Sequence, residues 1–100
     1  MIILKRTCSA CPEQYDAYIE GQGEIGKVGY LRLRHGYFRV DYPDCGGETI
    51  YQANPRGDGI FDDDERDYYL KWAVHSIEKR LSGISCQRPP PPDVQYKIME

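Results

Sequence analysis

The chain has 100 residues, of which 40% are apolar and 29% charged, and this composition suits one globular domain with a modest core. Its formal net charge of −3 argues against non-specific binding of duplex DNA, which needs a broadly basic surface. No stretch approaches the roughly 20 apolar residues that span a bilayer. The apolar run Ile2–Leu4 also ends too soon, at Lys5, for a secretion signal. We therefore expect a cytoplasmic protein without a membrane partner.

The first half of the chain predicts a series of short strands. Glycine-rich turn sequences separate five of them, which we place near residues 2–7, 15–20, 25–34, 37–42 and 49–53. Pro43 ends the fourth strand, because proline cannot donate to a strand ladder. Since the connections are short, the sheet should be mostly antiparallel.

A single amphipathic helix is predicted near residues 62–82. Asp62 and Glu65 have the spacing of a capping box, and Gly83 is suited to end the helix in the left-handed conformation. Apolar residues recur with a 3.6-residue period and form one stripe: Leu70, Ala73, Val74, Ile77 and Leu81. Packing that stripe on one face of an antiparallel meander sheet gives a single α+β domain over residues 1–86.

Residues 87–100 predict a proline-rich C-terminal tail. The run Pro89–Pro92 is a stiff polyproline segment, typical of a spacer and also of a ligand for an SH3-type groove. Beyond it, Val94, Tyr96 and Ile98 alternate as the residues of an edge strand do, but a frayed terminus explains them equally well. The sequence leaves both states open.

The dipeptide His35-Gly36 predicts a two-residue hairpin loop, and its length sets the register of the two strands that it joins. Counting outward from the loop places Arg32 directly opposite Arg39. Because side chains alternate between faces, one face carries Leu31, Leu33, Phe38 and Val40. The other face carries Tyr30, Arg32, Arg34, Tyr37, Arg39 and Asp41.

This arginine and tyrosine face is the most informative feature of the sequence. Like charges directly opposite each other in a ladder are destabilising. Guanidinium groups among phenol rings suit an anion that carries a ring, such as a nucleotide or single-stranded nucleic acid. An acidic protein partner would suit them as well. The alternative is a solvated sheet face, in which arginine stems cover apolar surface and Asp41 or nearby glutamates neutralise the charge.

The four cysteines support a second hypothesis, a small structural zinc protein. Cys8 and Cys11 have the spacing of a zinc knuckle, Cys45 precedes two glycines as a zinc ligand does, and Cys86 would complete a four-thiolate set. A strong motif would need a second knuckle, and only one is present. Four reduced, partly buried thiols explain the same residues.

The acidic loop Asn54–Glu65 resembles an EF-hand loop, with ligand positions at Asn54, Asp58, Asp62 and Glu65. However, Arg56 stands where an acidic or amide ligand belongs, and an acid-capped helix accounts for the same carboxylates. We predict that calcium does not bind tightly here. We also predict that Arg56 reaches back to one of these acids and takes the place of a cation.

No catalytic constellation is evident. His35 lies at the predicted hairpin tip and His75 on the predicted outer face of the helix, beside Lys71, and neither has a nucleophile directed at it. No glycine-rich phosphate loop joins a strand to a helix. We expect a non-catalytic binding or accessory module without a cofactor, whose partner is a protein or a small anionic ligand such as a nucleotide.

The stretch from Gly29 to Arg66, GYLRLRHGYFRVDYPDCGGETIYQANPRGDGIFDDDER, resembles small uncharacterised proteins of bacterial and prophage genomes. This resemblance covers the middle of the chain and brings no assigned activity, cofactor or catalytic residue. What it implies is a bacterial or phage setting.

Overall fold

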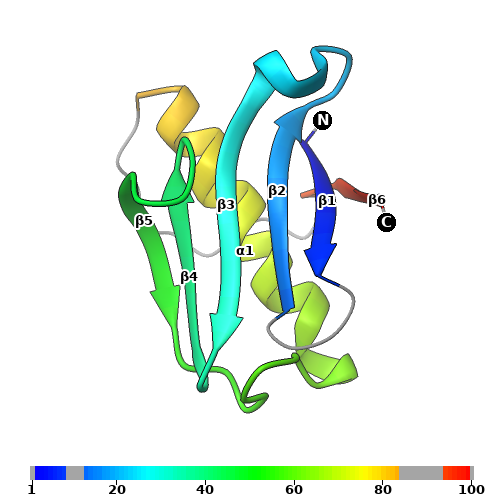
Figure 1. Ribbon diagram of the computed structural model, residues 1–100, viewed down its shortest axis with the longest axis vertical. Helices are drawn as coiled ribbons and strands as arrows, with labels where there is room; N and C mark the ends of the chain where they lie inside the picture. Colours follow the sequence, from blue (N-terminus) through cyan, green and yellow to red (C-terminus); the bar gives the residue numbers. More distant parts are fainter. Residues whose placement is uncertain (1, 9–12, 84–93, 100) are drawn as a thin grey trace.

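The computed structural model describes residues 2–8, 13–83 and 94–99, which form one six-stranded sheet with a single helix on one face (Figure 1). The predicted α+β class is confirmed. The strands are β1 (Ile2–Cys8), β2 (Glu13–Ile19), β3 (Lys27–Arg34), β4 (Tyr37–Tyr42), β5 (Glu48–Ala53) and β6 (Tyr96–Met99). The helix is α1 (Asp63–Leu81), and a short 3-10 turn, η1 (Gly23–Gly26), precedes β3.

The strand order across the sheet is β5-β4-β3-β2-β1-β6. The first five strands form an antiparallel meander, as predicted, and β6 then pairs in parallel with β1, Tyr96 lying opposite Ile2. A parallel partner needs a long crossover connection, and α1 lies on that route. Residues 96–99 therefore form the edge strand that was one of the two expected states of the C-terminal tail.

The hairpin between β3 and β4 has the predicted register. Arg34 lies opposite Tyr37, and Arg32 lies opposite Arg39. His35 and Gly36 both have positive φ, 54° and 71°, as a primed two-residue turn requires. The loop after β5 holds this turn, since the Gly36 N–H donates to the Asp58 carbonyl at 2.6 Å.

The core lies between α1 and one face of the sheet. Leu31, Leu33, Phe38 and Val40 are fully buried there, as are Leu70, Ala73, Val74 and Ile77 of the helix stripe. Gly29 permits the close approach of the two layers, because a Cβ at that position would lie 2.7 Å from Cδ1 of Ile77. Leu81 was also expected in the stripe, but it is 42% exposed because it is the last helical residue, beyond the sheet contact.

His75 contradicts its predicted place on the outer face of the helix, because only 8% of it is exposed. It follows Lys71 by one helical turn, on the flank of α1 near which Val94 packs against the core. The prediction was wrong because it treated the sheet as the only packing partner of the helix. Val94 and Tyr96 also pack against the core.

Candidate functional site

The candidate site lies on the sheet face that α1 does not cover. In Figure 1 the helix lies behind the sheet and this face is turned toward the viewer, with no other helix of the described residues across it. The turn between β4 and β5 folds over one end of the face, where the Gly46 N–H donates to the buried Asp41. The alternation of β3 places Tyr30, Arg32 and Arg34 here, because Leu31 and Leu33 are buried against the helix. The face predicted from the hairpin register is therefore assembled as expected.

At its centre, four side chains form a row across β2, β3, β4 and β5. In this arginine row, Gln14 lies opposite Arg32, Arg32 opposite Arg39, and Arg39 opposite Gln52. Directly paired residues share a face and lie about 5 Å apart, so the row brings two guanidinium stems together between two amides. Gln14 and Gln52 were not among the predicted residues of this face, because the pairing of β2 with β3 and of β4 with β5 includes bulges that the sequence does not mark.

Two tyrosines hold the glutamines of the arginine row. The Tyr30 hydroxyl donates to Oε1 of Gln14 at 3.4 Å, and the Tyr37 hydroxyl donates to Oε1 of Gln52 at 2.7 Å. Tyr37 is 39% exposed, so its ring remains accessible while its polar tip is satisfied. The phenol rings thus flank the two arginines in fixed positions.

The two arginines of the row differ in their partners. Nε of Arg39 lies 3.3 Å from Oδ2 of Asp41, a buried carboxylate that also accepts hydrogen bonds from the Thr49 hydroxyl and the Gly46 N–H. Arg32 makes no ion pair or hydrogen bond with any described residue, and its buried Nε has no hydrogen-bond partner. Asp41 therefore neutralises one arginine of the pair and leaves the other uncompensated.

The remaining acids near this face are already paired. Lys27 contacts Asp16 at 3.2 Å and Asp44 at 2.7 Å, and its hydrogen bond holds the pKa of Asp44 below the ordinary value. At the tip, Nε of Arg34 donates to Nε2 of His35 at 3.2 Å. The positive charges of Arg32 and Arg34 therefore have no carboxylate partner among the described residues, although the net charge of the whole chain is −3.

The predicted zinc ligands can be placed only in part. Cys11 and Cys86 lie outside the described residues, Cys8 ends β1, and Cys45 is exposed in the turn between β4 and β5. Two strands separate β1 from β4, so about 14 Å of sheet lies between them. This separation argues against Cys8 and Cys45 sharing one ion, and within the described part of the chain no cluster of three potential ligands occurs. The zinc site stays a prediction.

The acidic loop is organised by internal partners. The carboxylate of Glu65 accepts hydrogen bonds from the backbone N–H groups of Arg56, Gly57 and Asp62 at 2.8–3.0 Å, and the last of these is the predicted capping-box bond. Arg56 reaches Asp64 at 2.5 Å and lies 3.6 Å from Glu65. The prediction that Arg56 reaches back to these acids is confirmed.

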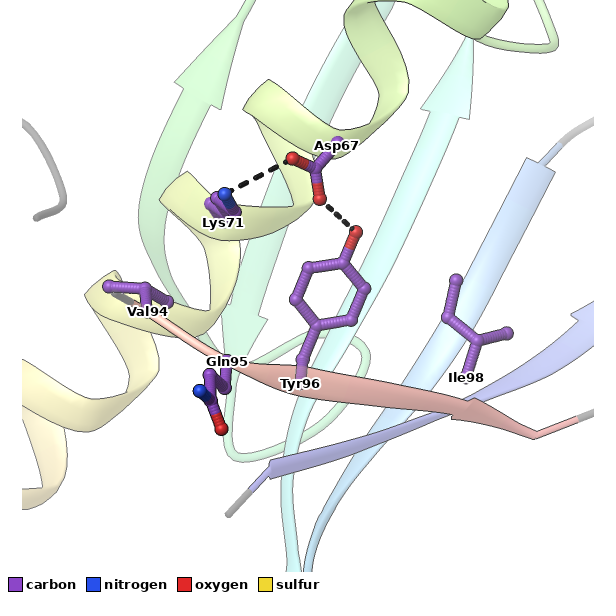
Figure 2. Close-up of a pocket in the computed structure, with 6 residues that line it drawn as sticks. All are labelled: Asp67, Lys71, Val94, Gln95, Tyr96 and Ile98. Carbon is purple, nitrogen blue, oxygen red and sulfur yellow. Dashed lines mark hydrogen bonds and ion pairs between the residues drawn. The ribbon is translucent and has the colours of Figure 1, made fainter. Parts of the chain in front are cut away.

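A groove of about 530 Å³ lies on the opposite side of the molecule, between α1 and β6 (Figure 2). Its lining residues are Asp67, Lys71, Val94, Gln95, Tyr96 and Ile98. Asp67 accepts a hydrogen bond from the Tyr96 hydroxyl at 2.7 Å and pairs with Lys71 at 3.2 Å, and the Tyr96 bond holds the pKa of Asp67 below its ordinary value. The two charged side chains of the groove, Asp67 and Lys71, pair with each other, so the groove is a weaker candidate for a ligand site than the open face.

Comparisons with protein-family models, with curated proteins and with solved structures found no match. In the described residues no helix is long and apolar enough to cross a membrane.

Proposed function

We propose that this chain is a small non-catalytic binding module that uses the arginine and tyrosine face to hold an anionic ligand or an acidic partner. The observation that carries the proposal is the pairing of Arg32 with Arg39, in which Arg32 has no acidic partner among the described residues. A like-charged pair across a ladder is unfavourable by itself, and an incoming anion removes the repulsion. We also place the module in the cytoplasm of a bacterium or phage-infected cell.

Binding of pyrophosphate to the amide-labelled protein at low salt tests this function. We expect resonance shifts confined to residues 30–39 and to Gln14 and Gln52, and we expect them to disappear in the double variant Arg32→Gln with Arg39→Gln. A control variant, Lys71→Gln with Lys79→Gln, changes the net charge by the same amount on the helix side. Shifts that are absent from the wild type, or that survive in the double arginine variant, would reject this face as the site.

A further inference from the structure

The open face does not have the shape of a small-molecule pocket. Small ligands usually bind in concave sites that bury most of their surface, whereas the arginine row lies on an open sheet with Tyr37 exposed at one side. A flat face built from cations and aromatic rings is typical of surfaces that hold an extended chain.

The guanidinium groups of this face match the geometry of a phosphate. The planar fork of arginine donates two parallel hydrogen bonds to a phosphate. Nε of Arg32 and Nε of Arg39 are buried and have no hydrogen-bond partner, although Nε of Arg39 lies 3.3 Å from Asp41. A phosphate would therefore contact the outer guanidinium nitrogens of the two arginines. Arg34, two residues along β3 from Arg32, extends the cations along the strand.

Tyr37 supplies the aromatic component beside these cations. Its hydroxyl is fixed by Gln52 at 2.7 Å, and its ring lies opposite Arg34 in the register of the hairpin. Bases of a single strand stack on such rings without regard to sequence, because each base has a π-face. A paired duplex hides those faces within its base stack, so it cannot stack a base on Tyr37.

From these observations we infer that the ligand of this face is single-stranded nucleic acid, with backbone phosphates on Arg32 and Arg39 and one base on Tyr37. This inference rests on the anion-binding function proposed above and specifies its ligand. It assigns the arginines to charge and Tyr37 to stacking, so the two contributions respond differently to salt.

The test is fluorescence anisotropy with a labelled oligothymidylate of about twelve nucleotides, measured from about 20 to about 200 mM salt. We expect Arg32→Gln with Arg39→Gln to weaken binding at least tenfold at low salt and to reduce the slope of log affinity against log salt by about 1.4. Tyr37→Leu should weaken binding about tenfold without changing the slope, and Tyr37→Phe, which keeps the ring, should bind nearly as the wild type does.

The control variant Lys71→Gln with Lys79→Gln has the same net charge as the double arginine variant and should keep the wild-type affinity. An oligothymidylate that does not bind at low salt overturns the inference, as does a duplex of the same length that binds equally well. If pyrophosphate still shifts the resonances of the face while the oligonucleotide does not bind, the anion site stands and the nucleic-acid ligand is rejected. If neither probe binds, both proposals fail.

Discussion

Charged groups at the N-terminal end of α1 and on the open face of the sheet are handled in opposite ways. The buried carboxylate of Glu13 accepts hydrogen bonds from the Tyr15 hydroxyl, the Phe61 N–H and the guanidinium of Arg66, at 2.5, 3.0 and 2.9 Å. On the open face, Arg32 has no described partner and lies opposite a second arginine. The first arrangement stabilises the fold, whereas the second leaves donors available to a ligand.

The pKa values at the helix end support this contrast. Burial raises the pKa of Glu13, but hydrogen bonds from Arg66, Tyr15 and the Phe61 backbone outweigh burial, and the pKa lies below its ordinary value of 4.5. Glu65 behaves in the same way through its three backbone donors. Both groups are therefore held as carboxylates by the fold, which is the mark of charges that stabilise structure.

Truncation of Glu13 should give the largest loss of stability. Glu13→Ala removes the buried partner of the ion pair with Arg66 and leaves the Tyr15 hydroxyl and the Phe61 N–H without their acceptor, so we expect a loss of about 3 kcal/mol in the free energy of unfolding. Urea unfolding followed by circular dichroism measures it. The matched control is Asp63→Ala, since Asp63 contacts the same arginine at 2.7 Å but is 97% exposed. It should cost about 0.5 kcal/mol or less.

Equal losses in the two variants would show that burial of the Glu13 carboxylate adds nothing, and the contrast between the two regions would fail.

The open face was predictable from the sequence because its geometry is local. A two-residue turn sets the register of its two strands, and alternation then assigns every side chain to a face, so Arg32 and Arg39 could be paired by counting. Gln14 and Gln52 belong to the next strands out, whose register depends on bulges that the sequence does not mark.

The helix end was less predictable because its contacts join distant segments. Glu13 and Arg66 are 53 residues apart, and the predicted strand began at Tyr15, two residues too late. The sequence did contain one signal for Glu13. It lies two residues before Tyr15 and four before Ala17, so the alternation of a strand places it on the same, core-facing side as these two residues. The parallel pairing of β6 with β1 has the same origin, since no local pattern specifies a partner at the other end of the chain.

The second prediction concerns the acidic loop. Glu65→Gln keeps one acceptor oxygen but presents an NH₂ group to backbone N–H donors, so we expect a loss of about 2 kcal/mol. Asp64→Asn is the comparison, because Asp64 pairs with Arg56 at 2.5 Å on an exposed surface, where solvent screens the ion pair, and it should cost much less than Glu65→Gln. Urea unfolding of both variants decides between a loop organised by Glu65 and a loop organised by the exposed ion pair. A larger loss for Asp64→Asn would contradict our assignment.

The third prediction follows from pH. Burial and the nearby Lys79 lower the pKa of His75 below 6.5, so the unfolded chain binds its proton more readily than the folded chain does. The contribution of neutral His75 to the free energy of unfolding is therefore fully present above pH 6.5, and it declines as the pH falls below that value. The carboxylates of Glu13 and Glu65 affect stability at lower pH. Their contribution to the free energy of unfolding is present above pH 4.5 and is lost as pH falls through their depressed pKa values.

Urea unfolding at a series of pH values separates these groups. His75→Leu should remove the decline that begins near pH 6.5 and keep the decline below pH 4.5, whereas Glu13→Ala should reduce only the lower one. A wild-type protein whose stability is constant between pH 6.5 and pH 5 would mean that His75 keeps access to solvent.

The smallest expected effect has the opposite sign and is the sharpest test of the open face. Arg32→Gln removes the repulsion with Arg39 and breaks no described hydrogen bond, so we expect it to stabilise the protein by about 0.3 kcal/mol at low salt, and by less at high salt. Arg39→Gln relieves the same repulsion but removes the partner of the buried Asp41, so it should destabilise by about 1 kcal/mol. Thermal unfolding of the two variants under the same conditions measures the difference. If Arg32→Gln destabilises as much as Arg39→Gln does, then Arg32 serves the fold, and the open face no longer carries an arginine that the structure leaves without a partner.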